Sequence, residues 1–381
     1  MRISSLETTP VSVPFERDEV WAYGRRSGIT NLLVEVRTDE GVVGLGEAVG
    51  WPSPEIALAT LESSRSVVVG RDPFAIQDIM GTLYERRGWH YFRHTAGCAL
   101  AGLEMALWDV VSTTCDLPLH VLFGGAVRER VAYYWHVASG DIDSMVASAR
   151  TAIAQGYETL YMKVGFEPGG TTDDVRAVRA AVGPGPRIRV DANEAWTVAE
   201  ALGAIREMEA LGLEFVEQPV NMYDRDGLAE IGERASVPIA ANQTTWDPFA
   251  TLEVLQRGSA SVIVTDPHQA GGLDRFKQLA AIAEIAGVPV VKHSFGDLGI
   301  STYACAHLLA TCVNCDLAHQ THGQLLADDV IAGGVPAFEA GALELPRGPG
   351  IGVELDPERV ARYAELYASG TVFSAYEKAP A

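Results

Sequence analysis

Short apolar runs recur about every 25 residues in the second half of the chain, and nearly every run ends at a residue that can bind a metal or transfer a proton. The segments between the runs carry apolar residues at helical spacing, and two of them, 197–212 and 271–287, end at a glycine. Strands that alternate with amphipathic helices predict an α/β fold with a parallel sheet, and eight such repeats predict a closed, TIM-type (β/α)8 barrel. The eight predicted strands lie at residues 131–139, 159–165, 187–193, 213–219, 237–243, 261–267, 288–294 and 314–320.

The first part of the chain has a different pattern. Residues 3–15 and 30–50 read as β-strands, and helical spacing follows at 53–70, 73–87 and 96–115. This order, a sheet followed by helices, predicts an α+β domain ahead of the barrel. We therefore expect an N-terminal α+β domain, a barrel and a C-terminal segment that packs back on the first domain, at residues 1–125, 126–325 and 326–381.

Composition limits the partners of this protein. Its net charge of −21 argues against nucleic acid and anionic membrane surfaces, because both attract a basic surface, whereas a small anionic substrate remains compatible with a locally positive site. No apolar stretch approaches the roughly 20 residues of a membrane span, and the first residues lack the apolar core of a signal peptide. We expect a cytoplasmic protein.

The cysteines do not indicate a disulfide framework. There are five of them, an odd number, scattered through segments of helical and strand character, so reduced thiols are the simplest expectation. Cys312, Cys315, His319 and His322 resemble a zinc motif only superficially. Three residues separate the cysteine pair from the histidines, which is too few for the chain to turn back around a metal.

Three consecutive predicted strands end in oxygen ligands. Asp191 and Glu217 end the third and fourth strands, and Asn242 or Gln243 ends the fifth. Neighbouring strands lie roughly 5 Å apart, so these side chains should converge, and hard oxygen donors suit Mg2+. The alternative is that each acid only caps the helix that follows it. Three in succession favour the metal site.

Groups that transfer protons flank this predicted metal site. Lys163 ends the second strand, while Asp266 and His293 end the sixth and seventh. A lysine beside a cation should have a lowered pKa, and an aspartate beside a histidine fixes the imidazole tautomer. A base on each face of a bound substrate is a proton-transfer geometry. In the alternative interpretation, Asp266 and His293 are a hydrogen-bonded pair with a structural role.

The ordered motifs resemble those of the enolase superfamily, in particular its mandelate racemase and muconate lactonizing group. The resemblance spans essentially the full length: Lys163, segment 190–196 with Asp191, segment 216–220 with Glu217, and Asp266 followed by His293. Segments 44–48, 106–110 and 117–125 are similar to that family's N-terminal capping domain. The resemblance implies Mg2+-dependent removal of the proton α to a carboxylate, with an enolate intermediate. It also implies a symmetric homo-oligomer.

A closing segment and several substrate contacts follow from the same picture. Residues 15–28 would form the loop that closes over a small carboxylate substrate and excludes water. The alternative for the loop residues is a surface or oligomer contact. The candidate substrate-binding residues, in this loop and at the strand ends, are Trp21, Tyr23, Arg25, Arg26, Trp51, Tyr161, Asn193 and His319.

Three positions depart from the family pattern. Tyr161 stands where the group usually carries a first lysine, an amide (Asn242 or Gln243) replaces a carboxylate ligand, and His319 replaces a glutamate. Losing one cation and one anion together leaves the net charge of the site unchanged. Dehydratases similar to glucarate dehydratase use an asparagine as the third ligand, and segment 293–301 resembles theirs.

The sequence supports three hypotheses about function. The first is a hydro-lyase of a sugar acid or other hydroxy acid, in which Lys163 or His293 removes the α-proton and the His293 imidazolium then expels a hydroxyl as water. The second is an isomerase, either a racemase, an epimerase or a cycloisomerase, in which Lys163 and His293 act on opposite faces of the substrate. The third is a barrel that binds no metal and catalyses no reaction.

Overall fold

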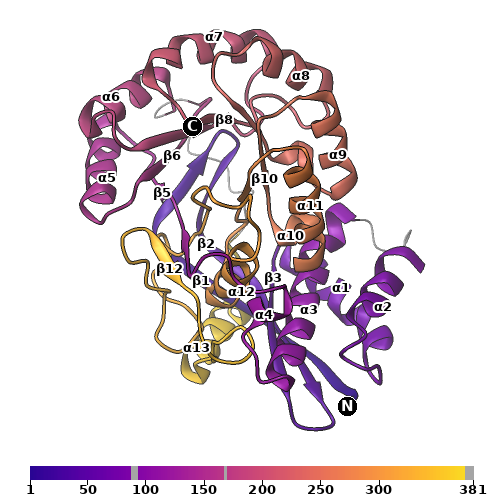
Figure 1. Cartoon of the computed structure of the whole chain (residues 1–381). Coiled ribbons are helices and arrows are strands. Elements are labelled where there is room, and N and C mark those ends of the chain that lie inside the picture. Colours follow the sequence, from indigo (N-terminus) through magenta and orange to yellow (C-terminus); the bar gives the residue numbers. More distant parts are fainter. Residues whose placement is uncertain (87–92, 167–169, 374–381) are drawn as a thin grey trace.

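A parallel sheet of seven strands curls into most of a barrel, with helices on its outer side (Figure 1). The computed structural model describes residues 1–86, 93–166 and 170–373. The strands follow the sheet in chain order: β5 (Trp135–His136), β6 (Thr159–Lys163), β7 (Arg187–Asp191), β8 (Phe215–Glu217), β9 (Ile239–Ala241), β10 (Val262–Thr265) and β11 (Val290–Lys292). Each of these strands lies within its predicted range: β6 and β7 begin at the first residue of theirs, and β8 to β11 lie in the middle.

Helices between the strands cover the outside of the sheet. They are α5 (Ile142–Ala154), α6 (Thr172–Val182), α7 (Val198–Met208) with the 3-10 turn η2 (Glu209–Leu211), α8 (Arg225–Arg234), η3 (Gln243–Thr245), α9 (Pro248–Arg257), α10 (Pro267–Ala270), α11 (Leu273–Ile285) and α12 (Gly299–Leu309). Side-chain caps start several of them. Thr171 and Thr197 each form a capping box with the acid three residues later. With helices outside and side chains inside, strands such as β6 are buried along their whole length.

The barrel is closed by an irregular segment, and the predicted strand at 314–320 is wrong in detail. His319 donates its backbone N–H to Ala132 O at 2.8 Å, and Gln320 donates to Lys292 O at 2.9 Å. These bonds connect β11 to the chain just before β5. A regular ladder does not form, because the Lys292 N–H is directed to the His319 ring Nδ1 at 3.0 Å.

The predicted first strand, 131–139, is also divided. Its beginning is β4 (Arg130–Ala132), which pairs antiparallel with β12 (Ala342–Glu344), and β5 alone enters the barrel.

The N-terminal part is a three-stranded antiparallel sheet with helices packed on it. The strands are β1 (Ile3–Trp21), β2 (Gly24–Thr38) and β3 (Val43–Val49), and the helices are α1 (Pro54–Val68), α2 (Ile76–Gly81), the π-helical turn η1 (Thr82–Arg86), α3 (Arg93–Thr114) and α4 (Leu119–Leu122). The predicted end of one helix, residue 87, lies outside the described residues. The expected closing loop 15–28 is instead the far end of the β1–β2 hairpin, with a register irregularity between Pro14 and Glu19.

Buried carboxylates join the N-terminal part to barrel helices. Glu47 of β3 accepts backbone hydrogen bonds from Leu298 at 2.8 Å and Ser301 at 2.9 Å, at the start of α12. Glu104 of α3 accepts one from Asp274 at the start of α11, at 3.4 Å. The cap residue of α11 is Gly272, where a side chain would collide with the Glu104 carboxylate. The N-terminal part and the barrel are therefore held together, because carboxylates of the first cap helices of the second.

The end of the described chain returns to the β1–β2 hairpin. After α13 (Pro357–Ala368), Thr371 O accepts a hydrogen bond from Ser12 Oγ at 2.7 Å, and Phe373 donates its backbone N–H to Thr30 Oγ1 at 2.9 Å. No helix in the described part of the chain has the length and apolar character needed to cross a membrane.

Candidate active site

Three strand-end residues form one layer inside the barrel. Lys163 is in register with Asp191, and Asp191 with Glu217, on three adjacent parallel strands. Residues in register on parallel strands point to the same face, and here that face is the interior. All three side chains are buried. The local sequences explain this placement, because each residue ends an apolar run that is covered on both sides.

Lys163 is held by three oxygens. Its Nζ donates to Asp191 Oδ2 and to Asn193 Oδ1, both at 2.8 Å, and lies 3.1 Å from the Tyr161 hydroxyl. Burial by itself lowers the pKa of Lys163, but the charges of Asp191, Glu19 and Glu217 more than offset this and raise it above its ordinary value. The lowered pKa predicted from the sequence rested on a neighbouring cation; the protein groups alone act in the opposite direction.

Two buried oxygens at the ends of β8 and β9 lack hydrogen bonds. Neither Glu217 Oε1 nor Gln243 Oε1 has a partner among the residues that the structure describes. Burial and then the charge of Asp191 raise the pKa of Glu217 well above its ordinary value. Asn242 is different, because its Nδ2 donates to Val264 O at 3.1 Å and lies 3.5 Å from Gln269 Oε1. Hard, unsatisfied oxygens next to a carboxylate fit a divalent cation such as Mg2+.

The expected hydrogen bond between Asp266 and His293 is not present. Asp266 caps the short helix α10, where its Oδ1 accepts the His268 N–H at 2.7 Å and contacts the His268 ring Nδ1 at 2.9 Å. Asp266 Oδ2 and His293 Nδ1 are both buried and both unbonded within the described ranges. Through Oδ1, the aspartate therefore positions His268, which follows it by two residues in the chain. The prediction of a directly hydrogen-bonded Asp266–His293 pair is wrong.

His293 is neutral in this environment. Burial lowers the pKa of its imidazole to about 3, with Lys163 and Lys292 acting in the same direction and Asp266 opposing them. A neutral imidazole can accept a proton. His293 lies just beyond β11, across the barrel mouth from Lys163, and both line the same cavity.

A second group of potential ligands is already neutralised. One ligand atom from each of Asp266, His268 and Asp297 lies within 4.8 Å of the others, a spacing that suits a metal ion. The Lys292 Nζ contacts Asp297 and lies 3.4 Å from Asp266 Oδ2, so its ammonium group supplies the positive charge there. These carboxylates raise the pKa of Lys292 above its ordinary value, despite the burial that lowers it. His268 and Lys292 were not among the residues predicted from the sequence, although each lies within two positions of a residue that was.

A cavity of about 320 Å³ lies over these groups. Lys163, His293, Asn242 and Gln243 line its barrel side, together with Asn193, and the β1–β2 hairpin contributes the opposite side. At the hairpin tip, the Tyr23 hydroxyl donates to the backbone carbonyl of Glu194 at 2.9 Å, in the loop after β7. The hairpin therefore covers the barrel mouth.

Some of the predicted substrate-binding residues line the cavity and others do not. Trp21, Tyr23, Arg26, Trp51 and Asn193 line the cavity. The three other candidates, Arg25, Tyr161 and His319, are not among the lining residues.

Each of these three displacements has a local cause. Arg25 lies 3.5 Å from Asp18 on the outer side of the hairpin. The Tyr161 hydroxyl donates to Asp191, below the cavity. His319 directs its ring nitrogens to Lys292 N and Cys315 O, and the next residue, Gln320, lines the cavity in its place. Strand alternation cannot place His319, because the segment is not a regular strand.

Two family profiles match the chain over most of its length. The profile described as mandelate racemase/muconate lactonizing enzyme, N-terminal domain, covers residues 6–124, and the profile described as enolase C-terminal domain-like covers residues 144–360. The chain belongs to the mandelate racemase/muconate lactonizing group of the enolase superfamily. The resemblance seen in the sequence motifs is confirmed, and so is the fold that it implies.

Enzymes of known activity are similar to this enolase-superfamily member along nearly its whole length. Chloromuconate cycloisomerase of Cupriavidus pinatubonensis is 30% identical over 366 residues, which cover 93% of this chain and 96% of that protein. L-Ala-D/L-Glu epimerase of Bacillus subtilis is 31% identical over 365 residues, 93% of this chain and 97% of that protein. The crystal structure of an enolase from Thermobispora bispora, complexed with magnesium and formate, has 29% identity, a TM-score of 0.89 and coverage of 99% of this chain and 96% of that one. The two named activities are isomerisations.

Proposed function

We propose that this protein is a Mg2+-dependent isomerase, a racemase or epimerase of a small carboxylic acid, which removes and returns the proton α to the carboxylate. The observation that carries the proposal is the placement of Lys163 and His293. They line one cavity from β6 and from the end of β11, on either side of the oxygen set formed by Asp191, Glu217 and Gln243. Two proton carriers on opposite sides of a bound substrate can act on both faces of the same carbon.

The dehydration favoured by sequence motifs alone has less support. Two relatives that match 93% of this chain are a cycloisomerase and an epimerase, and neither is a hydro-lyase.

The chain's own residues divide the work of the reaction. Asn193 Oδ1 and Asp191 Oδ2 hold the Lys163 Nζ, so the amine has a fixed direction at the cavity wall. On the other side, the Phe295 ring packs edge-on against His293 with centroids 4.8 Å apart and restrains the imidazole. Bound Mg2+ would supply positive charge opposite the negative charge that develops on the substrate carboxylate. The hairpin, which lines the cavity opposite Lys163, would limit the access of water to the bound substrate.

Deuterium exchange tests the proposal. The enzyme with Mg2+ is incubated in deuterated water with both enantiomers of 2-hydroxy and amino-acid-derived carboxylates, and proton NMR follows Cα exchange and product configuration. We expect exchange with inversion, and two complementary half-activities: Lys163→Ala keeps exchange for one enantiomer only, and His293→Asn for the other only. Neither variant should interconvert the enantiomers.

Two results would contradict the proposal. Accumulation of a 2-keto acid without inversion would identify a hydro-lyase. Unchanged exchange in both variants would remove Lys163 and His293 from the mechanism. Tyr223→Ala, which alters an exposed aromatic residue that is not part of the cavity lining, is the control for nonspecific effects of substitution.

A further inference from the structure

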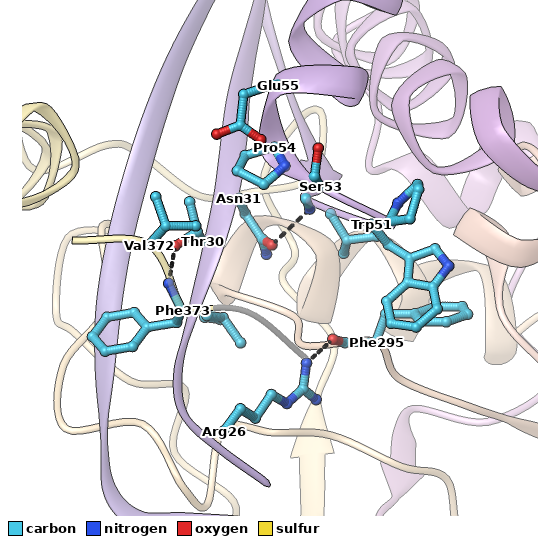
Figure 2. A pocket seen from close by; sticks show the side chains of 14 residues that line it. Arg26, Thr30, Asn31, Trp51, Ser53, Pro54, Glu55, Phe295, Val372 and Phe373 are labelled. Carbon is cyan, nitrogen blue, oxygen red and sulfur yellow. Dashed lines mark hydrogen bonds between the residues drawn. The ribbon is translucent and has the colours of Figure 1, made fainter. Parts of the chain in front are cut away.

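An aromatic wall forms one side of the active-site cavity. The Trp51 and Phe295 rings have centroids 5.5 Å apart, and Trp246 packs against the other side of Phe295 at 5.8 Å. All three line the cavity, as do Trp21 and Met222. Figure 2, drawn from the neighbouring cavity, shows Trp51 and Phe295 lying side by side. A ligand group that meets this wall meets ring faces and a thioether, which favour apolar and aromatic partners.

The cavity offers little positive charge beyond Lys163. Arg26 is the other cation among the described lining residues, and each of its three nitrogens already contacts a protein group. Its Nε donates to Glu19 Oε2 at 2.7 Å, its Nη2 lies 2.7 Å from His322 Nε2, and its Nη1 donates to Phe295 O (Figure 2). Glu19 faces the same space with a carboxylate. A second carboxylate on the substrate would therefore find no free cation on this side.

The polar floor of the cavity is also largely committed to the protein. Gln269 Nε2 donates to Asn242 O at 2.9 Å, and Ser294 Oγ lies 2.8 Å from the His322 ring nitrogen. Gln320 Oε1 accepts from the Ser294 N–H at 3.2 Å. A chain of substrate hydroxyls would lose its hydrogen bonds to water here and gain few in return. The volume of about 320 Å³ lies at the low end of the roughly 300–1,000 Å³ typical of small-ligand sites.

We infer that the substrate is a monocarboxylic acid whose side group is apolar and about the size of one aromatic ring, seated against Phe295, Trp51 and Trp246. The carboxylate end lies at the Lys163 and His293 side, and the ring end at the wall. This inference rests on the proposed α-proton chemistry for its kinetic test, but its binding test does not require turnover. It disfavours both sugar acids and dicarboxylates as substrates.

Four 2-hydroxy acids with the same reacting carbon separate the possibilities. They are 3-phenyllactate, 2-hydroxyglutarate, gluconate and lactate, each assayed for Cα deuterium incorporation with the Mg2+-loaded enzyme. We expect kcat/KM for 3-phenyllactate to exceed that for 2-hydroxyglutarate and gluconate by at least about tenfold. In parallel, calorimetry compares binding of 3-phenylpropanoate with that of glutarate, neither of which carries an α-hydroxyl. We expect 3-phenylpropanoate to bind at least about tenfold more tightly.

A variant tests whether the aromatic wall causes the preference. Phe295→Ala should lower kcat/KM for 3-phenyllactate by about tenfold or more and affect lactate far less, because lactate has no ring to lose contact. The matched control is Phe74→Ala, at a half-exposed phenylalanine of the N-terminal part. It should leave kcat/KM unchanged for both 3-phenyllactate and lactate. Equal losses for 3-phenyllactate and lactate would mean that Phe295 acts on His293 and not on the substrate side group, and would overturn its assigned role.

The possible outcomes distinguish a failure of the inferred substrate class from a failure of the proposed α-proton chemistry. Exchange that favours 2-hydroxyglutarate or gluconate overturns the substrate class and leaves the α-proton chemistry intact. If none of the four acids exchanges, calorimetry decides: selective binding of 3-phenylpropanoate supports the substrate class while the proposed chemistry fails for these acids. If 3-phenylpropanoate and glutarate bind equally, or neither binds, and no acid exchanges, the substrate class is overturned as well.

Discussion

Tyr161 occupies the position where the family usually carries a lysine, and its environment shows what the exchange does. Its hydroxyl donates to Asp191 and lies 3.1 Å from the Lys163 Nζ, and its side chain is fully buried below the cavity. Tyr161 is therefore a positioning residue: it orients the carboxylate of Asp191, which holds Lys163 and which we propose as a ligand of the metal. A phenol can do this without adding a second positive charge beside Lys163.

Tyr161→Phe should lower kcat by about tenfold, because a hydrogen bond to a charged group contributes about 1.5–3 kcal/mol and here it orients a catalytic pair. KM should change little, since the hydroxyl does not face the cavity. Steady-state kinetics with a good substrate, together with Mg2+ titration, measures both effects. Tyr133→Phe is the matched control, because the buried Tyr133 hydroxyl has no hydrogen-bond partner within the described residues. A tenfold rise in KM with unchanged kcat would argue for a substrate contact instead.

Two adjacent amide side chains, Asn242 and Gln243, are candidates for the third metal ligand. We propose Gln243, because its Oε1 is buried and unbonded in the described part of the chain, whereas the Asn242 amide is anchored to Val264 O. Gln243→Ala should weaken Mg2+ binding at least about tenfold, and Asn242→Ala clearly less. Calorimetric titration of both purified variants with Mg2+ compares them. The reverse order of affinities would assign the ligand to Asn242, and both variants should still show a cooperative melt.

At the scale of elements, carboxylates of the N-terminal and C-terminal parts cap helices of the barrel. Glu104 reaches from α3 to the start of α11, and burial, reinforced by the charge of Asp274, raises its pKa to about 8. Asp329 caps the start of α12 through Gly299 N at 2.8 Å, and burial raises its pKa to about 7. Groups with a folded-state pKa above the unfolded value favour folding at low pH. That contribution is lost as the pH rises through the folded value.

Glu104→Gln should therefore remove part of the pH dependence of stability. Near pH 4.5 the two proteins should have similar unfolding free energies, and toward pH 8 the wild type should weaken while the variant gains an advantage on the order of 2 kcal/mol. The neutral amide oxygen can still accept the hydrogen bond from Asp274 N. Urea denaturation at a series of pH values measures the difference, with the exposed Glu158→Gln as control. Parallel curves for wild type and Glu104→Gln would refute the assignment.

The elements also show which features followed from sequence pattern. Strands β6 to β11 lie inside their predicted ranges, because a strand covered on both sides must be apolar along its length. Two predictions were wrong. Segment 314–320 was predicted as a strand but is irregular, and residues 15–28 were predicted as a loop but form the end of a hairpin. Both depend on partners far away in the chain: a His319 side chain that replaces a backbone acceptor, and a second strand that extends β1 to Trp21.

At the scale of the whole molecule, the oxygen set creates a cost that a bound cation would relieve. Glu217 Oε1 is buried without a hydrogen bond from any described residue, beside a second carboxylate. Such groups reduce stability and are retained where they serve function. Binding of Mg2+ to the folded state alone stabilises it by about 2.7 kcal/mol when its concentration is 100 times Kd.

Mg2+ should therefore raise the melting temperature in a saturable way, and EDTA should reverse the rise. Glu217→Gln should abolish the response to Mg2+, yet be at least as stable as the wild type in EDTA, because it removes a buried carboxyl with a strongly raised pKa. Differential scanning fluorimetry with 0 to about 10 mM Mg2+ measures both effects. A wild type that ignores Mg2+ over this range would point to a barrel without metal.

The sequence by itself determined the barrel, the order of its strands and the identities of Lys163, Asp191, Glu217 and His293 as residues at strand ends. These depend on local periodicity, which any window of about 10 to 20 residues records. For the amide ligand, the role of Asp266 and the substrate contacts, the sequence supplied only candidates. Tertiary structure decided that Asp266 bonds His268, that Tyr161 and His319 turn away from the cavity, and that Arg26 and Phe295 shape it. The Asp266–His268 contact is local, but the other outcomes depend on competition among hydrogen-bond partners from distant segments, and only the folded chain brings these segments together.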